Sequence, residues 1–167
     1  MLFYKHMDSP VGRLRLVADE SSLVAVLWPN DRPTRIKLSD MHEDLHHPVL
    51  REAECQMTEY FEGERTTFEL PLRFRGTAFQ QRVWQQLLCI PYGRTRSYGH
   101  LALEIGNGSA ARAVGHANSK NPLSIVVPCH RVIGASGQLT GFAGGMETKA
   151  RLLKLEGARG RTSRAVE

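Results

Sequence analysis

A cysteine between a proline and a histidine is the residue in this 167-residue chain best suited to chemistry. The segment reads Pro128-Cys129-His130-Arg131 and follows the apolar, β-branched run 125–127. Such a run is typical of a buried strand, and Pro128 ends it because proline has no backbone donor. We therefore expect the thiol at the end of a strand, next to an imidazole and a guanidinium. A thiol reacts as thiolate, which cationic or hydrogen-bonding neighbours favour.

Most free cysteines are packing residues, and a lone Cys-His pair does not exclude that role. The other cysteines, Cys55 and Cys89, are too scattered for a disulfide framework or a Cys-x-x-Cys metal site. His42, His46 and His47 lack a cysteine or carboxylate set beside them, which favours a solvated segment over a metal site. We expect no metal, no cofactor and a reducing, cytoplasmic setting.

Charge is divided unevenly along the chain. Overall, 41% hydrophobic and 23% charged residues are typical of a soluble globular protein. No apolar run reaches membrane-spanning length and the start is no signal peptide, so we expect no membrane partner. Residues 1–76 hold 10 basic and 13 acidic side chains, a net charge of −3, whereas residues 77–167 hold 12 and 4, a net charge of +8. This asymmetry indicates that the second part binds a polyanion.

Residues 1–76 have the pattern of a small sheet with one helix. Alternating apolar residues within 2–28 predict short strands, and a further alternation at 68–72 predicts another. An apolar i, i+4 spacing from Pro48 predicts an amphipathic helix that Gly63 ends. We find no chemistry in this part and interpret it as a scaffold domain.

Residues 77–157 have a helical pattern, and we expect the basic tail 158–167 to be flexible. Thr77 is a candidate cap for the first helix, and Ser97 and Ser109 are candidate caps for two short helices joined by a Gly-containing turn. Such a pair is a helix-turn-helix candidate. The second helix is rich in small residues and has Arg112 as its one long cation before Lys120, which suits the minor groove better than base reading in the major groove. Close helix packing is the alternative interpretation.

Beyond the cysteine, a glycine-rich loop surrounds Phe142 and could approach a flat ligand closely. A last helix ends near Glu156, where the helix dipole opposes a carboxylate. A hydrogen bond between Glu156 and His130 would explain this location.

These residues carry a resemblance to a known family. The run 108–145 is similar to the O6-alkylguanine-DNA alkyltransferases, above all at 111–115, at Asn121-Pro122 and at 128–133. The similarity covers almost all of the second part. The first part resembles, more loosely, the ribonuclease-H-like domain of that family. The implied fold is mixed α/β, with this small domain before a helical domain that contains a winged-helix-like helix-turn-helix.

The resemblance implies roles residue by residue. Cys129 would take the alkyl group permanently, His130 would draw off the thiol proton through a water, and Glu156 would orient the imidazole. Asn121 would brace the turn, and Tyr98 would protonate the departing guanine. Arg112 would fill the hole left in the duplex by the flipped base. The remaining residues implied to contact DNA are Ser109, Ala111, Ala113 and Gly115, and those implied to line the guanine pocket are Val132, Ser136, Phe142 and Ala143.

The expected function is therefore direct reversal of O6-alkylguanine in double-stranded DNA, with one transfer per molecule and O4-alkylthymine as a further possible substrate. A thiolate is a suitable nucleophile for the alkyl carbon, and base flipping at a cost of about a few kcal/mol would expose the lesion. We expect a monomer when free and leave cooperative assembly on DNA open. The rivals are a non-covalent lesion sensor, a helix-turn-helix regulator and a Cys-His-Glu hydrolase. The first would lack Cys129, the second would need base-reading side chains, and the third would not need Arg112.

Overall fold

The computed structural model describes residues 1–157 and divides the chain into two compact units. The first holds Met1–Arg75 together with Pro122–Val126, and the second holds Gly76–Asn121 and the chain from Val127 onwards. The boundary that we expect after residue 76 lies one residue from this division. The sequence pattern does not predict the return of Pro122–Val126 to the first unit. The expected tail at 158–167 lies outside the described residues.

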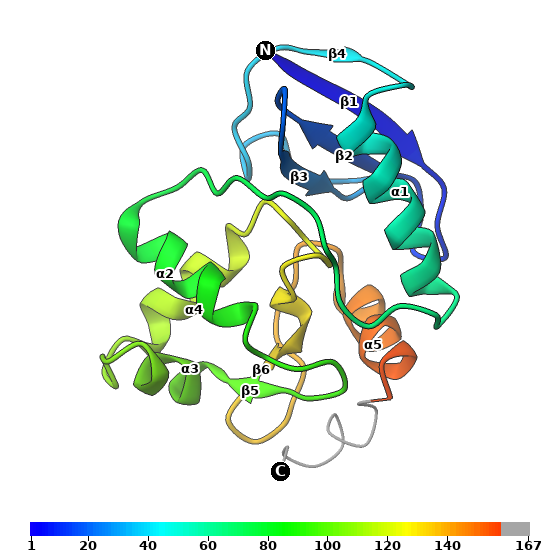
Figure 1. The fold of residues 1–167 in the computed structure, drawn as a ribbon. Coiled ribbons are helices and arrows are strands. Elements are labelled where there is room, and N and C mark those ends of the chain that lie inside the picture. Colours follow the sequence, from blue (N-terminus) through cyan, green and yellow to red (C-terminus); the bar gives the residue numbers. More distant parts are fainter. Residues whose placement is uncertain (158–167) are drawn as a thin grey trace. The chain divides into compact units, whose positions relative to one another are not determined.

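The first unit is a four-stranded sheet with a helix on one face (Figure 1). Its strands are β1 (Leu2–Met7), β2 (Leu14–Ala18), β3 (Leu23–Leu27) and β4 (Met41–Glu43), in the order β3-β2-β1-β4. The first three pair antiparallel, and β4 is parallel to β1. Helix α1 (Pro48–Phe61) has His47 as its N-cap. The His47 side chain is buried and accepts a hydrogen bond from the backbone N–H of Val49. The expectation that His47 is solvated is therefore wrong, because the ring caps α1.

Alternation along the strands gives the sheet two different faces. Lys5 points toward α1 and pairs with Glu54 at 3.1 Å. On the opposite face, Leu2, Val17 and Ala25 are buried in an apolar cluster. The expected strand at 68–72 is absent apart from one bridge between Leu23 and Leu72. Pro71 has no N–H to donate to a ladder, and only its carbonyl accepts, from Leu23 at 2.7 Å.

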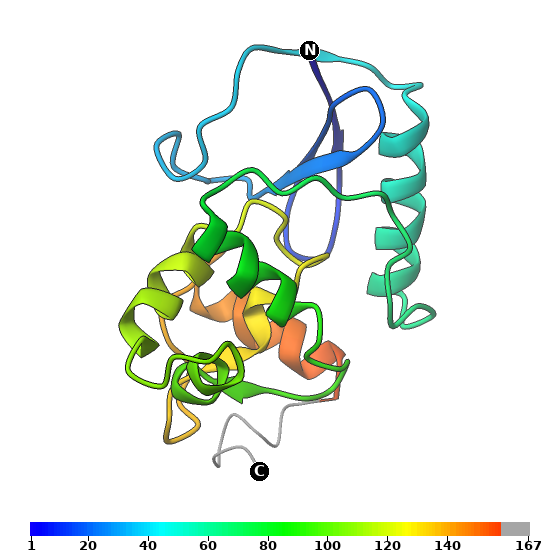
Figure 2. The same cartoon turned by 60° about the vertical axis from the view of Figure 1, so that its left-hand side comes forward.

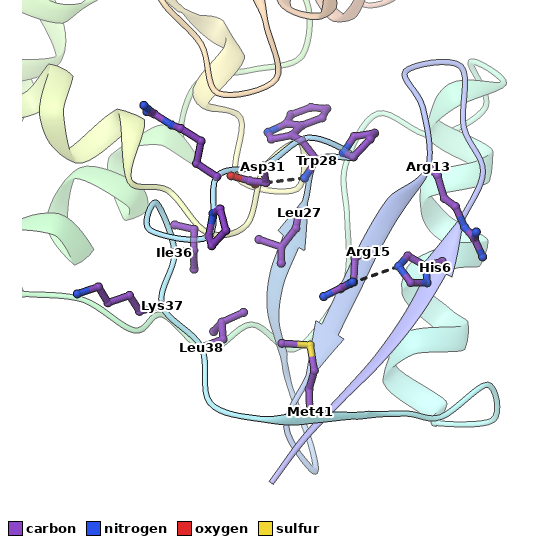
Figure 3. A pocket seen from close by; sticks show the side chains of 13 residues that line it. His6, Arg13, Arg15, Leu27, Trp28, Asp31, Ile36, Lys37, Leu38 and Met41 are labelled. Atoms are coloured by element: carbon purple, nitrogen blue, oxygen red, sulfur yellow. Dashed lines mark hydrogen bonds between the residues drawn. The ribbon is translucent and has the colours of Figure 1, made fainter.

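A hollow of about 630 Å³ lies on the sheet face opposite α1, beside the loop between β3 and β4 (Figure 3). Its floor is apolar and its rim is cationic. The floor is formed by Leu27, Ile36, Leu38 and Met41, and the rim includes Arg13, Arg15, Arg32 and Lys37. Arg15 Nε donates to His6 Nε2 at 3.3 Å, and burial together with both neighbouring arginines lowers the pKa of His6. All residues that line this hollow belong to the first unit.

One short segment returns from position 122 to the sheet of the first unit. The N–H of Val26 donates to the carbonyl of Pro122 at 2.8 Å, and Val26 and Leu123 form an isolated bridge. The segment that precedes Cys129 is therefore bound to the edge strand β3.

The second unit is mainly helical. Its helices are α2 (Ala78–Leu87), α3 (Tyr98–Glu104), α4 (Ala111–Ser119) and α5 (Met146–Leu155), with the short strands β5 (Arg96–Ser97) and β6 (Val132–Ile133). Thr77 caps α2 through a capping box, as expected, and Ser97 caps α3. The mixed α/β class predicted from the sequence is confirmed. In the described part of the chain no helix has the length and apolar character needed to cross a membrane.

Ser109 is not the cap that the sequence predicts for α4. The N-cap is Ala110, and no side chain makes a cap hydrogen bond there. Ser109 Oγ instead donates to Asn107 Oδ1 at 3.0 Å within the turn, which removes it from the helix end. Helix α4 is fixed by packing: Trp84 of α2 donates its indole N–H to the carbonyl of Ala117 at 2.9 Å.

Candidate active site

Cys129 begins a single 3-10 turn, η1 (Cys129–Arg131), rather than following a strand. The strand expected at 125–127 does not form, because Ile125 has φ 73°, a backbone conformation incompatible with an extended chain. At Pro128 the chain turns tightly again, and the N–H of Cys129 donates to the carbonyl of Val127 at 2.8 Å. Cys129 is only 4% exposed. A β-branched residue held at positive φ stores strain, as residues beside functional sites often do.

Two buried asparagines hold the backbone on either side of this sulfur. Asn121 Nδ2 donates to the carbonyl of Val127 at 2.9 Å, and Asn118 Nδ2 lies 3.4 Å from the carbonyl of Cys129. Both side chains are at most 5% exposed. The structure thus brings Asn121 to the turn, where the resemblance expects it, and adds Asn118, which the sequence reasoning missed.

His130 is fully buried and hydrogen-bonds Glu156. Its Nε2 lies 2.8 Å from Glu156 Oε2. Arg131 holds the same carboxylate with two hydrogen bonds, Nε to Oε1 at 2.8 Å and Nη2 to Oε2 at 3.0 Å. Its remaining terminal nitrogen donates to the carbonyl of Ile90 at 2.7 Å. Glu156 is the C-cap residue of α5, so a helix end and the 3-10 turn are joined through one carboxylate.

This network fixes the proton arrangement of His130. Burial alone would raise the pKa of Glu156, but His130 and the Arg131 guanidinium hold the pKa well below its usual range. Burial lowers the pKa of His130 more than Glu156 raises it, and Arg131 and Lys149 add to the lowering. An ionised carboxylate can only accept, so the ring proton is on Nε2. Nδ1 is buried without a hydrogen-bond partner among residues 1–157 and is the ring atom that can accept a proton.

Tyr98 reaches the same region from the first residue of α3. Strands β5 and β6 pair in parallel, with Ser97 opposite Ile133, and this sets the start of α3 beside the segment that follows Cys129. The Tyr98 hydroxyl lies 2.6 Å from Thr140 Oγ1. Burial raises the pKa of Tyr98, so the phenol keeps its proton at neutral pH.

Lys149 is a buried cation at this site that the sequence reasoning missed. Its side chain is fully buried, and its Nζ lies 3.2 Å from Thr140 Oγ1. Burial lowers the pKa of Lys149 to about 8, and Cys129 opposes the shift. Lys149 shares the i, i+3, i+4, i+7 stripe of α5 with Leu152, Leu153 and Glu156. This spacing could have predicted that a lysine faces the core.

The loop residues expected to line a pocket are only partly brought together. Val132 is buried in β6, and Phe142 has its ring centroid 5.8 Å from Lys149 Nζ. Ala143 is exposed. Ser136 is exposed too and is bonded to the Gln138 side chain, so no contact links it to the group around Cys129.

Helix α4 presents a slim surface. Arg112 and Ala113 are exposed, Ala111 and Gly115 are half-buried, and Val114 faces the core. The fit of Gly115 is close on its inner side, because a methyl group added there would lie 3.6 Å from the Tyr98 ring. The exposed residues of α4 are Arg112, Ala113, His116 and Ser119, and Arg112 is the single long cation, at the start of the helix.

In Figures 1 and 2 the η1 turn, in yellow, lies between α5 and α2 of the same unit. The side chains named above, from Tyr98 to Glu156, all belong to this second unit. Among residues 1–157 no group of three or more His, Cys, Asp or Glu side chains could hold a metal ion.

Two family models match the chain, one over each part. The model described as 6-O-methylguanine DNA methyltransferase, ribonuclease-like domain, matches residues 2–74, and the DNA binding domain of the same family matches residues 78–158. The methylated-DNA–protein-cysteine methyltransferase of Mycobacterium tuberculosis is 49% identical over 161 residues, which is 95% of this chain and 94% of that protein. The relative of the same name from Methanosarcina acetivorans is 46% identical over 157 residues, or 94% and 99% of the two chains.

The chain belongs to the 6-O-methylguanine DNA methyltransferase family. Solved structures agree with this assignment. The crystal structure of Mycobacterium tuberculosis OGT in complex with DNA has a TM-score of 0.86 against this fold, at 48% identity and 94% coverage of both chains. The crystal structure of the Mycobacterium tuberculosis O6-methylguanine methyltransferase gives a TM-score of 0.84 at 49% identity, covering 95% of this chain and 94% of that one.

Within this site the Pro-Cys-His-Arg string supplies three of the residues described above. Arg131 is part of that string, yet its role could not be read from it. The 3-10 turn directs two successive side chains, His130 and Arg131, to one carboxylate, and a strand would have directed them to opposite faces.

Proposed function

We propose that this methyltransferase-family chain moves an alkyl group from O6-alkylguanine in duplex DNA to the sulfur of Cys129. The observation that carries the proposal is a nearly buried cysteine whose neighbouring imidazole has its acceptor nitrogen free while a carboxylate holds the other nitrogen. The family match and the DNA complex of a 48% identical relative support the nature of the substrate.

Proton removal is the first step. Nδ1 of His130 takes the Cys129 proton through one water, and the charge that develops on the imidazole is opposed by Glu156. Glu156 also fixes the ring, because it accepts from Nε2 at 2.8 Å. Arg131 keeps Glu156 ionised throughout, so that the carboxylate holds the imidazolium and does not take its proton.

Transfer is an in-line displacement at the alkyl carbon. The S–C bond forms, the C–O6 bond breaks, and the electron pair stays on the guanine. Tyr98 supplies a proton to the departing base, which a phenol with a raised pKa still carries at neutral pH. The product is a thioether, a poor leaving group, and no group in the mechanism removes it. Each molecule therefore acts once.

Access to the lesion depends on the surface of α4. The small exposed residues of this helix suit the minor groove, whose width is about 6 Å. Arg112 enters the duplex where the flipped nucleotide leaves the stack, and this offsets an unstacking cost of about a few kcal/mol. Val132, Phe142 and Ala143 line the pocket for the extruded base. Ser136 is left out of this pocket, because it is exposed and bonded to Gln138.

The variant Cys129→Ser tests the acceptor directly. A serine hydroxyl is too weakly acidic to act as the nucleophile here, so transfer from methylated duplex DNA is abolished while binding to the same duplex stays within about twofold. The matched control is Cys89→Ser, which removes an exposed thiol and leaves both transfer and binding unchanged. Transfer that persists in Cys129→Ser would refute the role of this sulfur.

A further inference from the structure

Lys149 is a fully buried cation that the proposed mechanism does not use. Lysine is almost never fully buried unless it is paired. No carboxylate of the described residues lies within 4.0 Å of its Nζ, and its polar contacts go to Thr140: Oγ1 at 3.2 Å and the carbonyl at 3.5 Å. The face of Phe142 lies 5.8 Å away. A buried ammonium group without a nearby carboxylate is unfavourable for folding, so a functional role for Lys149 is expected.

Thr140 connects this cation to Tyr98. Its Oγ1 lies 3.2 Å from Lys149 Nζ and 2.6 Å from the Tyr98 hydroxyl. An ammonium group has three donors and no acceptor, so Lys149 must donate to Thr140. The threonine hydroxyl can then donate its own hydrogen to the Tyr98 oxygen. The phenolic hydrogen is left to point at a third group. Lys149 thus takes one lone pair of the Thr140 oxygen, and the Thr140–Tyr98 contact allows either hydroxyl to donate; the relay uses the arrangement in which Thr140 donates.

We propose that Lys149 and Thr140 are positioning residues that aim the Tyr98 proton at the departing guanine and replace it once it has been given. This inference rests on the proposed function, since it assigns the direction of one proton in the same reaction. It differs from a structural role for Lys149, because it makes the lysine matter most when the leaving group needs a proton.

The proton balance closes within these groups. As the C–O6 bond breaks, the electron pair stays on the guanine and the Tyr98 proton moves to a guanine nitrogen. The Thr140 proton moves to the Tyr98 oxygen, and a Lys149 proton moves to the Thr140 oxygen, which leaves a neutral amine. The Cys129 proton has gone separately to His130. A lysine whose pKa is lowered by burial to about 8 is charged at neutral pH and gives up a proton readily.

A different role for Lys149 would be to favour the Cys129 thiolate by its charge alone. The two roles differ in how they depend on the leaving group. Guanine leaves as an anion that must be protonated, whereas iodide leaves iodoacetamide without any proton. We call the proton transfer from Lys149 through Thr140 to Tyr98 the relay. Loss of the relay slows transfer from O6-benzylguanine only, whereas loss of thiolate stabilisation slows alkylation by both reagents equally.

The experiment measures both rates at Cys129 by peptide mass spectrometry, in a Cys55→Ser, Cys89→Ser background that removes the two exposed thiols. Thr140→Val keeps the shape of the side chain and removes the hydroxyl, and Lys149→Met keeps the length and removes the charge. Both variants lower the O6-benzylguanine rate by about tenfold or more, the scale of a weakened general acid. Thr140→Val leaves the iodoacetamide rate within about twofold, and Lys149→Met lowers it by less than the O6-benzylguanine rate, because the Lys149 charge also favours the Cys129 thiolate. Lys154→Met, an exposed position on the same helix, changes neither rate.

Further variants distinguish loss of the relay from a local change in structure. Thr140→Ser keeps a hydroxyl and restores most of the O6-benzylguanine rate. The double variant Thr140→Val, Lys149→Met loses no more than the more severe single variant, because both act through Tyr98. Lys149 is faced by Cys129, His130 and, through Thr140, Tyr98. Dividing the O6-benzylguanine rate by the iodoacetamide rate removes the effect of thiol ionisation, which both rates share. We expect this ratio to fall above about pH 8 in the native chain and to stay constant with pH in Lys149→Met.

Equal losses with both reagents, or no loss in Thr140→Val, would overturn the relay. If Lys149→Met does not fold, Thr140→Val alone gives the same decision. Failure of the proposed function has a separate signature: the native chain would then form no benzyl adduct on Cys129 at all, while iodoacetamide still alkylated it.

Discussion

Glu156 binds two cation-forming partners at once, and this is the main feature of the site at the scale of single residues. Arg131 keeps the carboxylate charged, and the charged carboxylate keeps the ring proton of His130 on Nε2. Arg131 thus determines the charge of Glu156, and Glu156 determines which nitrogen of His130 carries the proton. As a result Nδ1 of His130 is the nitrogen that can accept a proton. Removing any member should affect stability and transfer together.

Glu156→Gln tests this coupling. The amide keeps the size of the side chain but leaves Arg131 buried without a counter-charge, which in buried ion pairs costs about 3–5 kcal/mol. We expect a loss of that order in the free energy of unfolding, measured by urea denaturation, together with slower transfer. Glu147→Gln, in the exposed first turn of α5, changes the free energy of unfolding by less than about 0.5 kcal/mol. A similar small change in Glu156→Gln would contradict the network.

The pH dependence of stability follows from the same two groups. The folded-state pKa values of Glu156 and His130 are both lowered, so the unfolded chain binds more protons than the folded chain in acid. Stability therefore falls as the pH drops below the unfolded values, about 6.5 for histidine and about 4.3 for glutamate. Urea denaturation between pH 7.5 and pH 3 measures this decline, and Glu156→Gln should make the part below about pH 4.3 shallower. An equal slope in the two proteins would argue against Glu156 as a source.

At this scale the sequence predicts part of the site. Cys129 and His130 are adjacent in a specific string, and the unfavourable helix-end location of Glu156 already suggests a partner. Arg131 and Lys149 are different. The role of Arg131 depends on a 3-10 turn in place of a strand end, and the role of Lys149 depends on which face of α5 is buried.

At the scale of elements, the site depends on how short segments are held rather than on long regular structure. The β-branched run at 125–127 predicts a strand, but Ile125 at φ 73° bends the chain into tight turns, which propensity alone cannot reveal. These turns are stabilised by hydrogen bonds from side chains outside the run at 125–127. Asn121 is the clearest case, with its bond of 2.9 Å to Val127.

Asn121→Ala should therefore loosen the cysteine turn. The carbonyl of Val127 loses a buried partner, at a cost of about 1–3 kcal/mol in the free energy of unfolding, and transfer slows because the sulfur is less well fixed. Thermal or urea unfolding and single-turnover transfer rates measure the two effects. Asn107→Ala, in the exposed turn before α4, serves as the control. An unchanged transfer rate in Asn121→Ala would show that the rate does not depend on this support of the Cys129 turn.

Helix α4 carries a prediction of its own. Arg112→Ala should lower the transfer rate from methylated duplex DNA by about tenfold or more, because the hole in the stack is no longer filled. Transfer from free O6-benzylguanine, which needs no flipping, should stay within about twofold. Lys154→Ala removes an exposed cation of the same sign from α5 and should affect neither substrate. Equal losses on both substrates would rule out a role for Arg112 in the duplex.

At the scale of the whole molecule, charge distribution is what the sequence predicts most directly. The net charge of +8 in residues 77–167 and −3 in residues 1–76 needs no structure to be seen. The strands within residues 2–28 and the helices of the second unit also follow from periodicity, whereas β4 and the missing strand at 68–72 do not. The return of Pro122–Val126 to the first unit does not, because a bridge between Val26 and Leu123 is a long-range contact without a sequence signal.

This charge distribution implies that affinity for duplex DNA falls with salt. Each phosphate contact releases condensed counterions, so the logarithm of the binding constant should decline linearly with the logarithm of salt concentration. Titrations of an undamaged duplex by fluorescence anisotropy at several salt concentrations measure the slope. Arg112→Ala should make the slope shallower by about one contact or less, and a flat response in the native chain would remove the electrostatic basis for DNA binding.

The most direct test of the account is peptide mass spectrometry after incubation of the native chain with duplex DNA that contains one O6-methylguanine. We expect one added methyl group on the peptide that contains Cys129, none on those that contain Cys55 or Cys89, and a yield that stops at one methyl per molecule of protein. A methyl group on another residue, an unmodified Cys129 peptide after the lesion has disappeared, or repeated turnover would contradict it.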